Sequence, residues 1–275
     1  MRIQDESRRI AEDDRLRSLY MRDLIQAEHS LDVQFGNVTI PKVLIQFWHD
    51  LAALPADVQE CLESWAPLTA CGFKRLLFDD SKARAFIRRH FGDSYVTAFD
   101  RCRHPAMRCD YFRLCYICTN GGFYVDADEV YHGGDCEFLY RDNRLKVQPL
   151  CYDTRTDAMV CCDVFIAQKA CSPDWIFYVN NNPIVAPAFH PIIRSALARS
   201  TRILLSQAGE RLDIQATTGP GNLTASLVQY SIASRALAKH RDFLLLRDWK
   251  AISTSRWPLS YRDDERNWRL WSPAS

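Results

Sequence analysis

The chain has 275 residues, of which 47% are hydrophobic and 25% are charged, and its 35 basic and 34 acidic residues give a formal net charge of +1. A chain of this length and composition is an ordinary globular protein that can bury one large α/β core. The balanced charge, without a long run of either sign, argues against nucleic acid as a partner.

The chain also lacks the signatures of membrane insertion and secretion. No window approaches the roughly 18 consecutive apolar residues of a membrane span. The N-terminal sequence MRIQDESRRIAEDDRLR is charged from its start, unlike a signal peptide. We therefore expect a soluble, cytoplasmic protein without a transmembrane segment, for which peripheral contact with a membrane stays open.

Eleven cysteines are many for a chain of this size. Their odd number and the length of the chain argue against a disulfide framework, so we expect reduced thiols. Cys115 and Cys118 have the C-x-x-C spacing of zinc and redox sites, but they fall inside a predicted helix, without a second such pair. We interpret them as core cysteines. Cys161 and Cys162 likewise read as small apolar residues filling a strand.

Residues 1–30 carry apolar positions at helical spacing, which predicts one amphipathic helix or two short ones. This segment can pack on the rest of the protein, or it can contact a partner or a membrane; we favour packing. Gly36-Asn37 breaks the pattern. The expected organisation is therefore an N-terminal helical segment over residues 1–36 and a single domain over residues 37–275.

The next elements alternate between strands and helices. Residues 43–48 predict a buried strand, residues 58–65 a helix, residues 73–78 a second strand, and Ser81 is expected to cap a helix that continues to His90. A further helix and strand follow before residue 126. This order predicts a doubly wound, mostly parallel sheet flanked by helices, with ligands bound at the carboxyl ends of its strands.

Residues 104–130, HPAMRCDYFRLCYICTNGGFYVDADEV, contain the chemistry of most interest. Pro105 suits the first turn of a helix, and the glycines after Asn120 suit its end. Residues 123–125 then read as a short buried strand. Because strand side chains alternate with period two, Asp126 and Asp128 are expected to project to the same side. Two carboxylates there suit Mg²⁺ or Mn²⁺, which bind hard oxygen ligands and bridge to phosphate oxygens.

On the predicted helix, Asp110 and Arg113 lie three residues apart and therefore share a face. One interpretation is a surface helix with an ion pair, followed by an acidic turn. The other places both side chains above the acidic turn. The combined pattern, D-x-x-R, a helix and then G-G-x-Y-x-D-x-D, resembles the donor site of DXD-type glycosyltransferases. It is most similar to glycosyltransferase family 32, which includes yeast initiating mannosyltransferases and bacterial capsule sugar transferases, and more distantly to the clostridial glucosylating toxins.

The segment IPKVLIQFW resembles the opening motif of that family. The resemblance implies that Gln46, Phe47 and Trp48 line the pocket of the nucleotide base, and that Tyr124 of the G-G-x-Y motif also belongs to the donor site. The alternative is that Trp48 is a core aromatic residue at the end of a strand.

The second half of the chain is harder to interpret. Residues 145–147, 160–168 and 175–179 predict strands, residues 180–183 a turn leading into residues 184–188, and His190-Pro191 the start of a helix. The asparagines at 180–182 are either turn residues or groups that bind the acceptor or the donor sugar. Residues 217–222, TTGPGN, either form a simple loop or present backbone N–H groups at a helix start to an anion or a sugar hydroxyl. Residues 243–246 predict a last strand.

The C-terminal segment SYRDDERNWRLW is polar and aromatic, which is unusual for a mobile end. In related enzymes a segment that often contains H-W folds over the nucleotide and completes the metal shell. The matching residues here are Asn267 and Trp268, so the resemblance implies Asn267 as a metal ligand and Trp268 as a donor contact. Ordinary packing of the tail is the alternative.

The resemblance as a whole implies a GT-A-like glycosyltransferase, a hexosyltransferase that retains anomeric configuration. It implies a UDP- or GDP-sugar as donor, Mn²⁺ or Mg²⁺ as cofactor, and a glycan, lipid-linked or protein acceptor. Asp128 and Asp126 would bind the cation, and Asp110 and Arg113 would hold the donor sugar, with Arg113 also facing phosphate. Two other classes stay open: a metal-dependent hydrolase of nucleotide sugars, and a non-catalytic protein that binds them.

Overall fold

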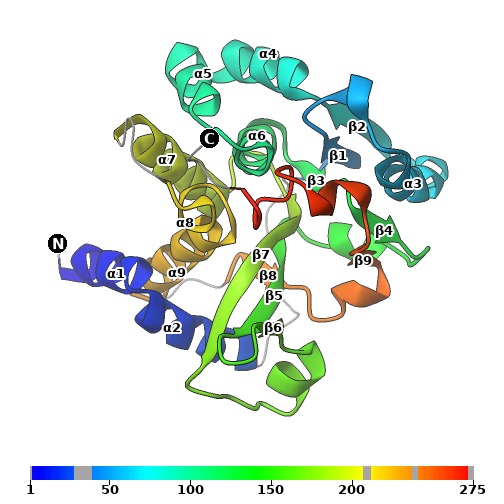
Figure 1. The fold of residues 1–275 in the computed structure, drawn as a ribbon. Coiled ribbons are helices and arrows are strands. Elements are labelled where there is room, and N and C mark those ends of the chain that lie inside the picture. Colours follow the sequence, from blue (N-terminus) through cyan, green and yellow to red (C-terminus); the bar gives the residue numbers. More distant parts are fainter. Residues whose placement is uncertain (1, 28–38, 207–211, 237–240, 272–275) are drawn as a thin grey trace.

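The structure is a computed structural model that describes residues 2–27, 39–206, 212–236 and 241–271. It contains a seven-stranded sheet in the order β2-β1-β3-β7-β5-β6, with β8 paired to β5 (Figure 1). The strands of this sheet are β1 (Val43–Phe47), β2 (Lys74–Phe78), β3 (Gly122–Tyr124), β5 (Leu145–Asp153), β6 (Ala158–Met159), β7 (Trp175–Ala186) and β8 (Phe243–Leu245). A separate small sheet pairs β4 (Glu129–Tyr131) with β9 (Ser253–Ser255).

Most strands of the main sheet point the same way. β1 is parallel to β2 and β3, β5 is parallel to β8, and β7 is antiparallel to both β3 and β5. Five strands therefore run in one direction, while β6 and β7 run in the other. This arrangement confirms the expected α/β class with a mostly parallel sheet.

Helices and loops cover both faces of the sheet. The helices are α1 (Arg2–Glu12), α2 (Asp14–Gln26), α3 (Ala56–Ser64), α4 (Asp80–Phe91), α5 (Asp93–Asp100), α6 (Pro105–Asn120), α7 (Pro191–Ser206), α8 (Ile214–Thr217) and α9 (Pro220–Ala236). Side chains of α2, α4, α5, α6, α7 and α9 share a large core with one face of the sheet, and Trp65, Leu68 and Trp249 pack on the other.

The alternation of strand side chains separates these two cores. In β1, Ile45 belongs to the large core and Leu44 to the smaller one. Neighbouring residues of β3 and β7 divide in the same way. Both faces are therefore apolar, which explains why these strands read as continuous hydrophobic runs in the sequence.

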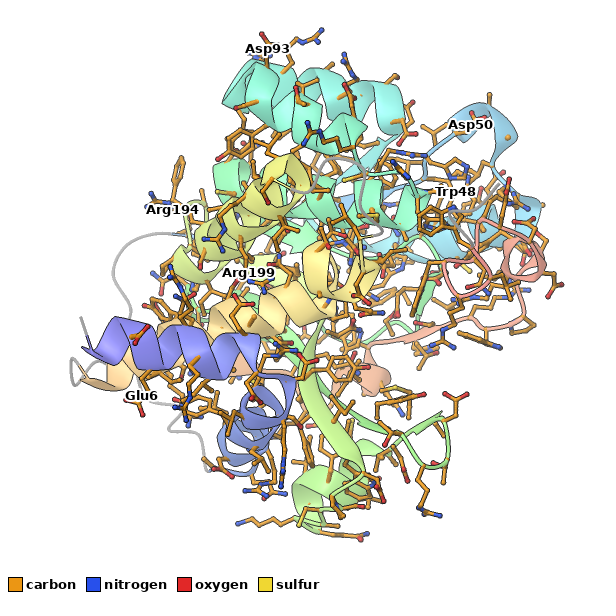
Figure 2. The ribbon with its side chains drawn as sticks, turned by 60° about the vertical axis from the view of Figure 1, so that its left-hand side comes forward. Glu6, Trp48, Asp50, Asp93, Arg194 and Arg199 are labelled. Atoms are coloured by element: carbon orange, nitrogen blue, oxygen red, sulfur yellow. The ribbon has the colours of Figure 1, made fainter. Side chains whose placement is uncertain are left out.

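The N-terminal residues form two helices that pack on the domain. Met21, Leu24 and Ile25 of α2 are fully buried in the large core. The Ser18 hydroxyl accepts from the N–H of Phe177 in β7 at 3.0 Å. Arg199 of α7 donates to Glu12 at 2.8 Å and so ties α1 to the domain (Figure 2). The expected packing is confirmed, whereas the boundary at residues 36 and 37 lies outside the described residues.

Several local predictions are wrong. Residues 180–183 are not a turn but part of the long strand β7, and residues 160–168 contain a single π-helical turn, Asp163–Ala167, instead of a strand. Cys161 is exposed and does not fill a strand. Asp79, rather than Ser81, caps α4, because its carboxylate accepts from the N–H of Lys82 at 2.7 Å.

All eleven cysteines are free, as expected, and Cys115 and Cys118 are buried in α6. Within the described ranges, no helix combines the length and apolar character that crossing a membrane requires.

The topology brings three strands together at one place. β1 and β3 are parallel neighbours, with Ile45 opposite Tyr124, so their carboxyl ends meet. β7 runs back along β3 with Ile184 opposite Tyr124, so Asn182 lies across from Asp126. The C-terminal tail passes beside the same strand ends (red in Figure 1).

Candidate active site

A cleft of about 670 Å³ lies where these strands end. This volume is in the range of pockets that bind small molecules and cofactors. The residues singled out from the sequence that line it are Phe47, Trp48, Asp110, Arg113, Asp126, Asp128, Asn180, Asn181, Asn182, Asn267 and Trp268. Gln46 and Tyr124 are buried behind the cleft and do not line it.

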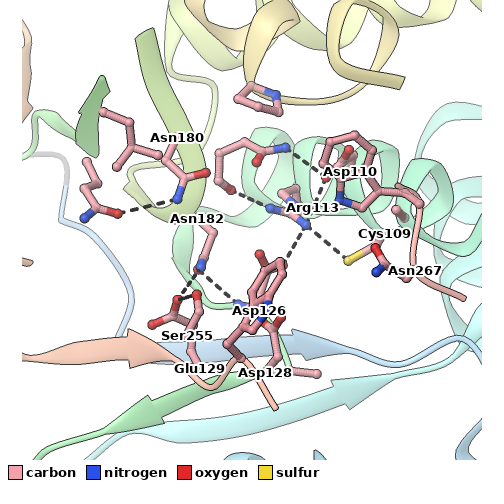
Figure 3. A pocket seen from close by; sticks show the side chains of 18 of the residues that line it. Cys109, Asp110, Arg113, Asp126, Asp128, Glu129, Asn180, Asn182, Ser255 and Asn267 are labelled. Atoms are coloured by element: carbon pink, nitrogen blue, oxygen red, sulfur yellow. Dashed lines mark hydrogen bonds and ion pairs between the residues drawn. The ribbon is translucent and has the colours of Figure 1, made fainter. Parts of the chain in front are cut away.

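Arg113 connects the helix to the acidic turn (Figure 3). Its Nη2 lies 2.7 Å from Asp126 Oδ1 and 3.0 Å from Asp110 Oδ1, and its Nη1 donates to the backbone oxygen of Asn181 at 2.6 Å. The guanidinium also lies 4.3 Å from the centre of the Tyr124 ring. The interpretation of a surface ion pair is therefore wrong, because the Arg113 side chain is only 4% exposed.

Burial and charge act in opposite directions on Arg113. Burial alone would lower the pKa of its guanidinium, but Asp126 and its other acidic neighbours raise that pKa well above the ordinary value. Arg113 is therefore a fixed positive charge that holds Asp110 and Asp126 at set positions.

Asp110 is the more deeply buried of the two carboxylates. It accepts from Asn181 Nδ2 at 2.8 Å and from the Thr218 hydroxyl at 3.4 Å. Burial raises the pKa of Asp110 to about 6, although Arg113 acts in the opposite direction. The loop before α9 lies against Asp110, since a Cβ on Gly219 would be 3.4 Å from Asp110 Oδ2.

The acidic residues reach the cleft by a route that differs from the prediction. β3 ends at Tyr124, and residues 127 and 128 form a turn, so strand alternation does not place the two carboxylates. Asp126 Oδ1 accepts from Arg113 and from the Tyr124 hydroxyl at 3.1 Å. Asp128 Oδ2 accepts from the Tyr261 hydroxyl at 2.9 Å and pairs with Arg262. Both side chains nevertheless line the same cleft.

Glu129 is a third acidic side chain at this turn. It accepts from Asn182 Nδ2 at 3.0 Å and from the hydroxyls of Ser253 and Ser255 (Figure 3). Burial raises the pKa of Glu129 to about 7, although the two serine hydroxyls oppose the shift. The Asn182 side chain also accepts from the N–H of Asp126 at 3.0 Å, so it links Glu129 to the acidic turn.

The residues at the turn suit a hard divalent cation. Burial and the charge of Asp126 both raise the pKa of Asp128, so added positive charge would stabilise the ionised pair. Side-chain donors among the described residues engage only Oδ1 of Asp126 and only Oδ2 of Asp128. Among all residues that the structure describes, no group of three or more His, Cys, Asp or Glu side chains has the arrangement of a metal site. A cation here would therefore take further ligands from water, a bound anion or a neutral side-chain oxygen of the cleft.

Aromatic side chains form another wall of the cleft. The Trp48 ring (Figure 2) packs edge-on against the Tyr261 ring, with centroids 5.2 Å apart, and its centroid lies 5.1 Å from that of the His49 ring. Trp48 is 8% exposed, and its indole N–H has no partner in the described residues. Phe47 and Trp48 line the cleft and Gln46 does not; the contact of these residues with a nucleotide base stays a prediction.

The C-terminal tail is fixed at several points along its length. The N–H of Ser260 donates to Asp57 at 2.6 Å, and His104 contacts the backbone oxygen of Glu265 at 2.9 Å. Asn267 is buried, donates to the backbone oxygen of Arg262 at 2.8 Å, and accepts from the N–H of Arg269 at 3.2 Å. Trp268 is more exposed, at 36%.

Three cleft residues that contact the acidic turn or form part of it, Glu129, Tyr261 and Arg262, were not singled out from the sequence. Glu129 directly follows Asp128, so a third acidic residue was visible in the motif. Tyr261 and Arg262 carried no signal beyond the unusual composition of the tail, because only the folded chain brings them to residue 128.

Comparison with known proteins gives limited similarity. No protein-family model matches the chain. A protein of Acanthamoeba polyphaga mimivirus, described as an uncharacterized glycosyltransferase, is 26% identical over 101 residues, which cover 36% of this chain and 40% of that protein. The solved structure of PaToxG glycosyltransferase aligns over 86% of this chain and 84% of its own, with 12% identity and a TM-score of 0.47. Both matched proteins are named as glycosyltransferases.

Proposed function

We propose that this protein is a metal-dependent glycosyltransferase that moves a sugar from a nucleotide-diphosphate sugar to an acceptor. The observation that carries the proposal is the meeting of Asp110, Arg113, Asp126 and Asp128 in one cleft at the carboxyl ends of β1 and β3. Carboxylates that can hold a cation, beside a fixed arginine and an aromatic wall, match the needs of a nucleotide diphosphate and a sugar.

The comparison supports the same class of reaction. The mimivirus protein carries the name glycosyltransferase, and this chain matches 40% of its length. The sequence pattern in residues 105–130, which resembles the donor site of family 32 glycosyltransferases, coincides with the residues that line the cleft. The GT-A-like assignment, the UDP- or GDP-sugar donor and the glycan, lipid-linked or protein acceptor are part of this proposal.

In the proposed reaction Asp126 and Asp128 hold Mn²⁺ or Mg²⁺, with Asn267 as a further oxygen ligand from the tail. The cation, when bound, neutralises charge that develops on the departing diphosphate. Asp110 accepts hydrogen bonds from sugar hydroxyls, and Arg113 keeps Asp110 and Asp126 in register. Trp48 and Trp268 contact the donor from the aromatic side of the cleft.

The stereochemical outcome is proposed from the resemblance, which implies retention by displacement on the same face of the sugar. Glu129 is the one additional carboxylate at the acidic turn, and Asn182, Ser253 and Ser255 hold it at the edge of the cleft.

A thermal-shift panel of UDP- and GDP-sugars, each with and without Mn²⁺, tests the proposal. A ligand at 100 times its dissociation constant adds about 2.7 kcal/mol, or roughly 5–10 °C for a chain of this size. We expect a shift that requires both the nucleotide sugar and Mn²⁺. Donor turnover that never responds to an acceptor would indicate a hydrolase, and binding without any turnover a non-catalytic protein. No shift with any nucleotide sugar would contradict the proposal.

A further inference from the structure

Arg262 brings a positive charge from the C-terminal tail to the acidic turn. Its guanidinium pairs with Asp128 Oδ2, and its side chain is only 14% exposed. The group lies 4.1 Å from the centre of the Trp257 ring and 5.3 Å from that of Tyr261. Its Nε is buried and has no hydrogen-bond partner among the described residues, although Arg262 lines the cleft. Part of its donor capacity is therefore not used by the protein.

Hydrogen bonds of the neighbouring tail residues hold Arg262 in place. Tyr261 donates to the same carboxylate oxygen of Asp128 at 2.9 Å, and the backbone oxygen of Arg262 accepts from Asn267 at 2.8 Å. The other arginines of the tail do not share this arrangement. Arg256 pairs with the exposed Glu60, and Arg266 pairs with Asp264 two residues earlier. Arg269 lies over the rings of Trp257 and Trp268, 5.0 Å and 5.3 Å from their centres. Of these four arginines, Arg262 is the one that pairs with the acidic turn.

A cation on Asp128 and the guanidinium of Arg262 would share one carboxylate. Two positive groups at one carboxylate repel each other, so Arg262 should oppose the binding of a divalent ion by itself. A diphosphate reverses this effect, because its negative oxygens attract both groups at once. An arginine fork is also well suited to bind phosphate oxygens.

We propose that Arg262 is a diphosphate-binding residue that shares Asp128 with the divalent cation, so that its charge weakens binding of the cation alone and strengthens binding of nucleotide diphosphate together with the cation. This inference rests on the proposed function, because it assigns a further residue to the same donor site. Arg262 differs from Arg113 in its partner at the turn. Arg113 engages Asp110, Asp126 and Asn181 through Nη1 and Nη2 and leaves only its buried Nε without a partner, whereas Arg262 pairs with Asp128.

The test compares wild type with Arg262→Gln and with the control Arg256→Gln, which removes an arginine of the same tail from a surface pair. Binding of Mn²⁺ alone is measured from the electron paramagnetic resonance signal of the free ion. Binding of UDP and GDP in saturating Mn²⁺ is measured by calorimetry. We expect Arg262→Gln to bind Mn²⁺ alone at least about threefold more tightly and the diphosphate at least about tenfold more weakly. Arg256→Gln should match wild type in both.

Arg262→Lys separates charge from shape and also serves if the glutamine variant does not fold. It should bind Mn²⁺ alone as wild type does, but bind the diphosphate more weakly, because lysine keeps the charge and loses the fork. If both affinities of Arg262→Gln or Arg262→Lys equal those of wild type, or if both fall together, Arg262 is a structural residue and the inference is wrong. If wild type itself binds no diphosphate with Mn²⁺, the proposed function fails and this inference fails with it.

Discussion

The side chain of Arg113 sets the geometry of the site. One buried guanidinium contacts Asp110, Asp126 and the backbone of Asn181, which come from three different parts of the chain. Lysine keeps the charge but cannot bridge three acceptors in a plane. We expect Arg113→Lys to lower donor turnover by about 100-fold or more, because small displacements of reacting groups have effects of that size.

The control for this substitution is Arg108→Lys on the same helix as Arg113, which alters the more exposed pair of Arg108 with Asp80 of α4. Turnover of the control should stay within about twofold of wild type, since that pair is partly solvated. Thermal unfolding of both variants shows whether a loss comes from the fold. Equal turnover in Arg113→Lys and wild type would show that the bridge is not needed.

The raised pKa of Asp110 predicts how the stability of the protein depends on pH. Its pKa is about 6 in the folded protein, above the ordinary value of 3.8, so the folded state holds this proton more tightly than the unfolded state does. The contribution of Asp110 to the unfolding free energy therefore falls as pH rises from about 4 to about 6. Asparagine does not titrate, so the stability of Asp110→Asn relative to wild type should rise over that range and level off above it. Urea unfolding at a series of pH values measures the difference, and a difference that stays constant from pH 4 to 8 would contradict the assignment.

The C-terminal tail shows no helix or strand pattern in its sequence, yet we expect two of its residues to bind the cation and the donor. Asn267→Ala should weaken Mn²⁺ binding in the presence of nucleotide more than it lowers the melting temperature, because it removes the oxygen ligand that we propose the tail supplies. Trp268→Ala should chiefly weaken donor binding. The exposed Asp263 offers a control, Asp263→Asn, that should leave both unchanged. If a chain truncated after Leu259 folds and turns over donor at the full rate, the tail is ordinary packing.

The elements also show which parts of the site could be predicted. α6 and β3 were predicted closely, because proline, glycine and a buried apolar run mark their limits within a few residues. β7 was divided by a predicted turn, because Asn180 to Pro183 have turn composition and only pairing with β3 and β5 makes them a strand. That strand sends Asn181 toward Asp110 and Asn182 toward Glu129, so the error concealed both contacts.

The N-terminal helix α2 contributes buried side chains to the large core of the protein. Leu24 of α2 is fully buried, whereas Leu19 on the same helix is 40% exposed. Leu24→Ala should lower the unfolding free energy by about 2–5 kcal/mol, and Leu19→Ala by well under 1 kcal/mol. Urea unfolding of both variants measures the difference. Equal stability of the two variants would mean that α2 is a separable addition.

The α/β class could be predicted because strand and helix patterns are local and alternate along the chain. The reversed directions of β6 and β7, and the approach of the tail to residue 128, depend on contacts between residues far apart in sequence. Hydrophobic periodicity contains no information on such pairings, so the contacts of Tyr261 and Arg262 with Asp128 could not be predicted from the sequence.

We propose that Asp126 and Asp128 hold a cation that binds a nucleotide diphosphate. The decisive measurement is calorimetric titration of UDP and GDP in saturating Mn²⁺, with wild type and with the Asp126→Asn, Asp128→Asn double variant. Asparagine keeps the size of each side chain and removes the charge. We predict that wild type binds one of the two diphosphates only with Mn²⁺, and that the folded double variant loses at least about 100-fold in affinity. Equal affinity of the folded double variant and wild type would contradict the claim.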